Sequence, residues 1–176
     1  MLRLVCVIGH GIDLVRHFIN HYQKYVDEIN FVVYETDEYP DINKRLKEII
    51  VDYENVKIVT VIQDRVYDWE KVTKLYNFVK NKKSDDWWVI ADIDEFHLYP
   101  KDNLRELVYD CEENGWDIVR GGFIDRIGPD GTLPEIMPLL SIWQQFPNAG
   151  FFRYPLSKAC PNKISVAKGH VIITSG

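Results

Sequence analysis

The sequence has no excess of positive charge and no long apolar run, and each absence excludes a class of protein. Its 176 residues include 21 Lys and Arg against 27 Asp and Glu, a formal net charge of −6. A general basic surface for nucleic acid is therefore excluded. The apolar stretch over residues 4–8 is too short for a membrane span or a secretory signal. We expect a cytoplasmic protein, or a soluble piece of a larger one, with no membrane span and no nucleic-acid partner.

Cysteine is also scarce. The three cysteines Cys6, Cys111 and Cys160 are odd in number and far apart, a pattern typical of reduced thiols in a reducing compartment. We expect them in or near the core, because Cys6 lies in an apolar run and Cys111 on the apolar face of a predicted helix. With 46% apolar and 27% charged residues, the chain has the composition of an ordinary globular protein. Its length suits one domain that needs no disulfide or metal to support its core.

Apolar, β-prone runs alternate with amphipathic helical patterns along most of the chain. The predicted strands are 2–8, 29–34, 56–62, 87–91 and 117–123, and the predicted helices lie around 12–26, 42–50, 69–79 and 104–111. Strand–helix alternation predicts an α/β domain with a mostly parallel central sheet and helices on both faces. We further expect Asp102 to cap the fourth helix, and Lys163 to Thr174 to form a closing hairpin that turns at Lys168-Gly169. Ligands of such sheets bind at the carboxyl ends of the strands.

The strongest functional pattern is Asp92-Ile93-Asp94-Glu95-Phe96, which directly follows the buried strand WWVIA. Paired carboxylates at the mouth of a strand repel each other and are costly to desolvate. A divalent cation removes both objections, since Mg²⁺ and Mn²⁺ prefer oxygen ligands and often bridge to phosphates. We therefore predict Asp92 and Asp94 as metal ligands. The structural alternative is that they only cap a loop.

A second pattern follows the fifth strand, where Asp125 and Arg126 precede the turn sequence Pro129-Asp130-Gly131. Asp125 lies past a strand end, on the same predicted edge as the acidic motif. There it can act as general base toward an acceptor hydroxyl, or it can simply fix the loop. We predict Asp125 as the catalytic residue, with Glu135 as the reserve candidate.

The ends of the first two strands supply candidates for contact with a nucleotide. Gly9 begins the segment Gly9-His10-Gly11, which lacks the later glycines of a Rossmann fingerprint but still lets a ligand approach the backbone closely. Glu35 and Asp37 follow the second strand and are able to bond a ribose or base, or are solvated loop acids. Together with Asp92, these residues form the predicted nucleotide-binding set.

Several of these segments together resemble the family 2 glycosyltransferases, in the branch related to the family 92 enzymes. The segments that carry the resemblance are WWVIADIDEF, the Phe18-Ile19-Asn20-His21-Tyr22 helix, Gly121 to Arg126 with Asp130 to Leu133, and Asn162-Lys163-Ile164. The resemblance implies a GT-A nucleotide-binding fold over residues 1–176. It also implies transfer of a sugar from a nucleotide-diphosphate-sugar donor to a carbohydrate or glycoconjugate acceptor, with Mn²⁺ or Mg²⁺ as cofactor. In that assignment Asp94 coordinates the cation, while Asp92 contacts the ribose or a metal-bound water.

One feature of that family is missing from the sequence. Family members place a metal-binding His after the final hairpin, whereas this sequence ends at Gly176, where that segment would begin. The resemblance therefore implies either a metal site that lacks this ligand or a fragment that ends before it.

Two other functions compete with sugar transfer. One is a nucleotide-sugar-binding module without turnover, which the missing His favours. The other is a Mg²⁺-dependent phosphotransferase of the haloacid-dehalogenase type, which also uses a D-x-D pattern at a strand end. That pattern belongs on a first strand and continues to Thr, whereas here it follows the fourth strand and continues to Glu95-Phe96.

Overall fold

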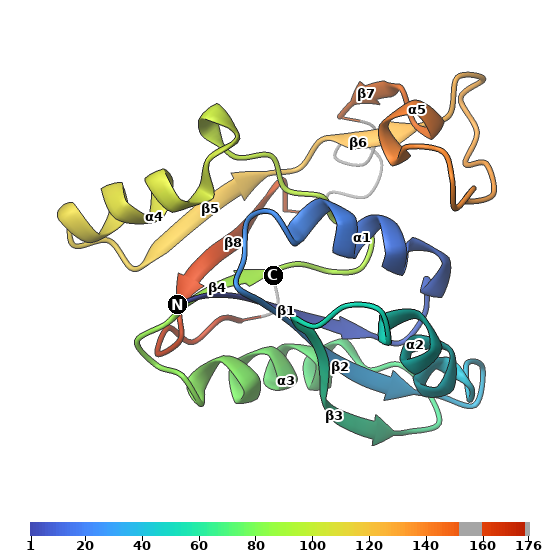
Figure 1. Cartoon of the computed structure of the whole chain (residues 1–176), viewed down its shortest axis with the longest axis horizontal. Coiled ribbons are helices and arrows are strands. Elements are labelled where there is room, and N and C mark those ends of the chain that lie inside the picture. The colour runs from blue at the N-terminus through green and yellow to red at the C-terminus, as the bar shows by residue number, and fades with distance from the viewer. Residues whose placement is uncertain (152–159, 175–176) are drawn as a thin grey trace.

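A computed structural model of the chain describes residues 1–151 and 160–174. Its centre is a six-stranded sheet (Figure 1). The strands, in their order across the sheet, are β3 (Val56–Gln63), β2 (Glu28–Glu35), β1 (Leu2–Ile8), β4 (Trp87–Ile90), β8 (Asn162–Lys168) and β5 (Ile118–Gly122). The first four strands are mutually parallel, and β8 runs antiparallel to both β4 and β5. The predicted α/β class with a mostly parallel sheet is confirmed.

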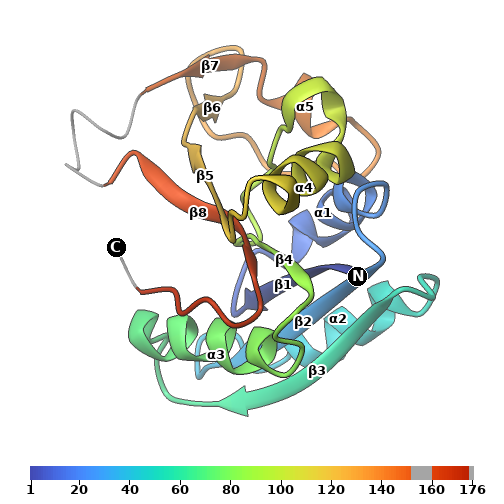
Figure 2. The same ribbon diagram turned by 90° about the vertical axis from the view of Figure 1, so that its left-hand side faces the viewer.

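Helices cover both faces of this sheet, and their apolar stripes explain the arrangement. The helices are α1 (Val15–Tyr22), α2 (Ile42–Ile50), α3 (Trp69–Asn81) and α4 (Leu104–Glu113), with short 3-10 turns η1 (Ile12–Leu14) and η2 (Pro100–Asp102). The apolar sides of α1, α2 and α4 share one buried core with β1, β2 and β4. Helix α3 packs against the opposite face in a second core, so α1 and α4 lie on one side of the sheet and α3 on the other (Figure 2). Strands β1 and β2 are buried along almost their whole length because both of their faces are covered.

The expected closing hairpin is wrong. A turn follows β8 at residues 169–170, but residues 171–174 form no second strand and run along α3 instead. The Asn77 side chain donates to the Ile173 carbonyl (2.8 Å) and accepts from its N–H (3.0 Å), while the Lys80 ammonium donates to the carbonyls of Gly169 and Val171. These side chains of α3 take the backbone groups that a hairpin partner would have used.

The start of α4 also differs from the prediction. Asn103 caps this helix by accepting from the Glu106 N–H (3.1 Å), whereas Asp102 lies in η2 and binds the Lys24 ammonium and the Tyr25 hydroxyl. Asp102 thereby joins this turn to the end of α1.

The cysteines follow the prediction in two of three cases. Cys6 and Cys111 are buried, Cys160 is exposed, and all three are free. Across the described ranges 1–151 and 160–174, the structure contains no helix that is both long and apolar enough to span a membrane.

A small second sheet carries the excursion between β5 and β8. Strands β6 (Asp125–Ile127) and β7 (Asn148–Gly150) pair antiparallel, with α5 (Ile142–Gln145) between them in the chain (Figure 1). The buried Gln145 side chain organises the loop before α5 by bonding to the main chain of Met137 and Leu140. Asp130 accepts from the Thr132 N–H and hydroxyl, which confirms the predicted turn at Pro129–Gly131.

The contact between the turn after β8 and α3 leads to a first testable expectation. A Cβ at Gly169 would lie 2.2 Å from the Lys83 carbonyl oxygen and 2.6 Å from that of Lys80. Both are backbone atoms, so Gly169→Ala must displace the turn, at a cost near the upper end of the ~1–3 kcal/mol typical of overpacking. Gly121→Ala is the matched control, since its Cβ would make only ordinary contacts at 3.6 Å with Ser165. Urea unfolding of the two variants measures the difference, and equal midpoints would contradict the expected clash.

Candidate functional site

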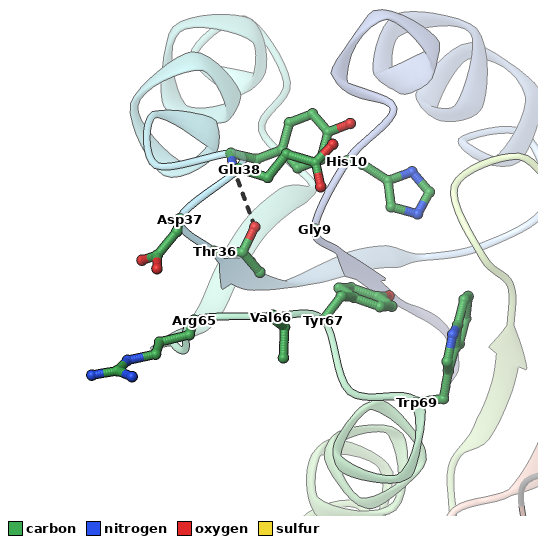
Figure 3. Close-up of a pocket in the computed structure, with 10 residues that line it drawn as sticks. Gly9, His10, Thr36, Asp37, Glu38, Arg65, Val66, Tyr67 and Trp69 are labelled. Atoms are coloured by element: carbon green, nitrogen blue, oxygen red, sulfur yellow. Dashed lines mark hydrogen bonds between the residues drawn. The ribbon is translucent and has the colours of Figure 1, made fainter.

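The carboxyl ends of β1, β2 and β3 surround an open pocket of about 820 Å³ (Figure 3). Its lining comes from the segments that directly follow these strands: Gly9, His10, Thr36, Asp37, Glu38, Tyr39, Arg65, Val66, Tyr67 and Trp69. This is the sheet edge at which α/β proteins bind ligands. Two predicted nucleotide contacts, Gly9 and Asp37, are among the lining residues, although whether they bind a nucleotide stays a prediction.

Aromatic rings form one part of the pocket wall. Tyr67 lies over Gly9, where an added Cβ would come within 2.4 Å of the ring, so the absence of a side chain at Gly9 makes room for Tyr67. The Tyr67 ring is also 5.0 Å from that of Trp69 and 5.6 Å from that of His10. Trp69 is 63% exposed and leaves much of its ring open to a ligand. Flat apolar surfaces of this kind are suited to stacking against a planar heterocycle.

The opposite part of the pocket is polar. Asp37 and Arg65 lie at the end of the pocket away from His10 and Trp69 in Figure 3. The backbone of the two segments is joined by a bond from the Asp37 N–H to the Arg65 carbonyl (3.3 Å). Thr36 fixes the loop by accepting from the Tyr39 N–H (3.3 Å). The pocket thus offers both acidic and basic side chains beside an aromatic wall.

Glu35 does not line this pocket. Its carboxylate accepts from the Gln63 side chain (2.9 Å) and the Asn43 N–H (3.3 Å), contacts that join the end of β2 to β3 and to α2. A nucleotide contact by Glu35 stays a prediction, and its two bonds within the protein differ from the solvated loop acid that was the alternative.

The acidic motif follows β4, the strand that pairs with β1 on the side away from β2. Ile93 points inward, where it contacts Gly11. Electrostatics link the motif to the pocket, since Asp92 and Asp94 both raise the pKa of Tyr67, after the larger effect of its burial. The acidic motif and the pocket therefore lie at the same edge of the sheet.

Helix α1 holds the loop that carries the motif. The Tyr22 hydroxyl donates to the Glu95 carbonyl (2.9 Å) and accepts from the His97 N–H (3.0 Å), while His21 Nε2 lies 2.8 Å from the His97 carbonyl oxygen. Phe96 adds ring contacts with Phe18 and His21. The His-Tyr pair in the first helix, noted in the sequence for its resemblance, thus has a physical role in fixing the loop after β4.

The two aspartates of the motif have different surroundings. Asp92 Oδ1 accepts from the Tyr76 hydroxyl (2.5 Å), and its Oδ2 accepts from the Lys163 ammonium (2.8 Å). Asp94 is exposed, and no hydrogen bond or ion pair joins its carboxylate to another of the described residues. The pKa of Asp94 is raised by partial desolvation and then by the negative charges of Glu95 and Asp92, whereas His10 lowers it. Asp94 is therefore the carboxylate of the motif that is open to a ligand.

A divalent cation fits this arrangement only in part. Within residues 1–151 and 160–174, no group of three or more His, Cys, Asp or Glu is placed to hold a metal ion. Asp92 already uses both oxygens, and Asp94 alone is open. Mg²⁺ in phosphate-transfer sites is often held by one or two carboxylates together with substrate phosphates. The side chains thus fit a cation that brings phosphate oxygens with it, and not one held by the protein alone; that Asp92 and Asp94 are metal ligands stays a prediction.

Asp125 lies apart from these groups in the chain, at the start of β6, where it pairs with Gly150 of β7. Strand β5 runs parallel to β4, so the segment that follows β5 leaves from the same sheet edge as the acidic motif. Arg126, the next residue, contacts the segment before β7. Its guanidinium donates to the carbonyls of Phe146 (2.8 Å) and Pro147 (3.2 Å) and lies 4.9 Å from the centre of the Trp143 ring.

Four contributors to the site escaped the sequence analysis. Arg65, Tyr67 and Trp69 follow the third strand, and this position at a strand end was the only indication of a binding role. Trp69 was interpreted as the first residue of the predicted helix 69–79. Lys163 lies in a segment that carries the family resemblance, but nothing in the sequence connected it with Asp92, which it reaches from a strand 71 residues further along the chain.

Comparisons with known proteins identify no family for this chain. No protein-family model matches the sequence, and no curated protein matches it with significance. A solved structure described as a 4-diphosphocytidyl-2C-methyl-D-erythritol synthase is similar to 96% of this chain and 75% of that chain, with 12% sequence identity and a TM-score of 0.47. Similarity at that level establishes neither a shared family nor a shared activity.

Proposed function

We propose that the protein is a glycosyltransferase that moves a sugar from a nucleotide-diphosphate-sugar donor to an acceptor hydroxyl. The observation that carries the proposal is that two features lie at one sheet edge. One is a pocket with an aromatic wall, and the other is the acidic motif after β4. A nucleoside suits the pocket, and its diphosphate then extends toward Asp94. The family resemblance of the sequence segments points the same way.

The proposed roles follow from the contacts of each group. Tyr67 and Trp69 would stack against the base, while Asp37 accepts hydrogen bonds from base or ribose donors. Asp94 faces the diphosphate and would hold a cation shared with it, which when bound supplies positive charge to the departing nucleotide. Asp125 would accept the proton of the acceptor hydroxyl in an inverting transfer.

Donor binding and donor hydrolysis test this function together. Thermal shift with uridine, guanosine, cytidine and thymidine diphosphate sugars, each with and without Mn²⁺, should show one series that raises the melting temperature, because a ligand of the native state stabilises it. Slow release of nucleotide from that donor would then demonstrate turnover. Binding without release would favour the binding module, and phosphate release from p-nitrophenyl phosphate would favour the phosphotransferase. No melting shift with any donor would contradict the proposal.

The aromatic wall gives a specific expectation for the same assay. Trp69→Ala should weaken donor binding by about 1–3 kcal/mol, the usual effect of removing an aromatic stacking partner of a base. Phe78→Ala is the matched control, because Phe78 is an exposed aromatic residue of the same helix that does not line the pocket. Calorimetric titration of both variants measures the effect, and equal losses of affinity would contradict a stacking role for Trp69.

A further inference from the structure

Lys163 makes an unusual set of contacts with the acidic loop. Its ammonium nitrogen lies 2.8 Å from Asp92 Oδ2, 3.0 Å from Glu95 Oε1 and 2.9 Å from Glu95 Oε2. A lysine ammonium has three N–H donors, and here three carboxylate oxygens accept them. One nitrogen atom thus lies between two carboxylates, a position that a metal ion can also take among acidic side chains.

The surroundings strengthen these contacts. The Lys163 side chain is 27% exposed and that of Glu95 is 13% exposed, so water screens the ion pairs only partly. Burial lowers the pKa of Lys163, but the charges of Glu95 and Asp92 outweigh that effect and raise it, so the ammonium stays charged. Glu95 is also tied into the loop, because its Oε2 accepts from the Asp92 N–H (3.1 Å).

The position of Lys163 in the fold explains how it reaches the motif. Strand β8 is inserted antiparallel between β4 and β5, so its first residues lie beside the carboxyl end of β4. Lys163 is the second residue of β8 and pairs with Gly121 of β5. The insertion therefore delivers one positive charge to the end of the strand that carries the aspartates.

We propose that Lys163 is a positioning residue that acts as the resident cation of the acidic loop, occupying Asp92 and Glu95 and leaving Asp94 as the one carboxylate open to a divalent cation. The inference deepens the proposed function and rests on it in one respect: the phosphate oxygens that complete the cation's shell come from the nucleotide donor. Divalent cations then bind weakly to the protein alone and firmly only with the diphosphate. Lys163 makes cation binding conditional on the donor.

Removal of this ammonium should create a metal site where none was complete. In Lys163→Met, Asp92 and Glu95 lose their counter-ion, and Mn²⁺ alone should bind at least about tenfold more tightly than it binds the wild type. The variant should also melt at a lower temperature without Mn²⁺ and regain much of the difference at saturating Mn²⁺. Calorimetric titration with Mn²⁺ alone and thermal melting provide both readouts, neither of which depends on turnover.

Two further variants separate this role from a merely structural one. Lys168→Met removes a lysine at the far end of the same strand, where its ammonium lies 3.5 Å from Glu112, and should leave Mn²⁺ affinity unchanged. Lys163→Arg keeps the charge and should behave like the wild type toward Mn²⁺. A structural role alone would lower the melting temperature of Lys163→Met without any gain in Mn²⁺ affinity, and that result overturns the proposal.

The experiment remains decisive if Lys163→Met folds poorly. The variant is then purified in parallel with millimolar Mn²⁺ and with a chelator, and the proposal requires soluble protein in the first case. Insolubility in both cases overturns the proposal, because Mn²⁺ then fails to replace the ammonium. Since nucleotide is absent throughout, a failure of the wild type to bind any nucleotide sugar would refute the proposed function without affecting this result.

Discussion

Asp94→Asn is expected to abolish most of the gain in nucleotide-diphosphate affinity that Mn²⁺ gives the wild-type protein. Asp94 is the exposed carboxylate of the motif, whereas both oxygens of Asp92 are bonded to Tyr76 and Lys163. Asn has nearly the same shape as Asp but carries no charge to hold a cation. Sugar transfer should fall by ~10²–10³-fold, the usual loss when one preorganised electrostatic group is removed.

The same substitution should leave the fold intact. Asp94 is repelled by Glu95 and Asp92, so neutralising it removes an unfavourable interaction and the melting temperature should not fall. Asp92→Asn should instead destabilise the fold, because it weakens a charged hydrogen bond to Lys163. We expect it to cost about 1.5–3 kcal/mol of stability. Asp85→Asn, an exposed aspartate before the amino end of β4, is the neutral control. Equal diphosphate affinity of the wild type with and without Mn²⁺ would refute the metal role of Asp94.

The central strands were predictable because a strand buried on both faces consists almost entirely of apolar residues. The runs at 2–8, 29–34 and 87–91 are apolar at nearly every position, and the structure places them in the three adjacent strands β2, β1 and β4. The amphipathic stripes of the helices were legible for the same reason, since one face of each contacts the sheet. The acidic motif was then placed at the carboxyl end of the sheet, because it directly follows one of these predicted strands.

What the sequence could not supply were relations between distant segments. The alternation around 163–174 suits a hairpin, but whether 171–174 pairs with β8 depends on competition from Asn77 and Lys80, which lie about 90 residues earlier in the chain. The insertion of β8 between β4 and β5 is equally a matter of long-range pairing. Without it, no pattern connects Lys163 to Asp92.

Local chemistry was ambiguous wherever one residue type suits two roles. Glu35 follows a strand end as a ligand-binding acid would, yet its carboxylate bonds to Gln63 and Asn43. Asp102 is a good helix cap by type, but the adjacent Asn103 takes that role because Asp102 is drawn to Lys24 and Tyr25. Such choices depend on neighbours in space and are settled only by the fold.

Asp125→Asn is expected to reduce sugar transfer by ~10²–10⁴-fold, the usual contribution of a general base, while donor and Mn²⁺ binding stay nearly unchanged. Asp125 begins β6 after the chain leaves β5 at the sheet edge shared with the acidic motif. In an inverting transfer, one carboxylate must take the acceptor's proton as the new bond forms. The Asn side chain fills the same space but cannot accept that proton.

The structure sharpens the competing structural explanation and its control. Arg126, the next residue, fixes β6 by donating to the carbonyls of Phe146 and Pro147, so this strand has a clear structural role that does not involve proton transfer. Arg126→Met should therefore lower the melting temperature and weaken transfer together. Asp125→Asn should lower transfer alone. Transfer rate, donor affinity and melting temperature, measured on both variants, distinguish a general base from a residue with only a structural role.

A second carboxylate between β5 and β8 is tested beside Asp125. Glu135, exposed on the loop after the Asp130 turn, is the alternative base, so Glu135→Gln completes the comparison. An Asp125→Asn enzyme with unaltered turnover, together with loss of turnover in Glu135→Gln, would transfer the role to Glu135. Full activity in both variants would refute an inverting mechanism that relies on either carboxylate.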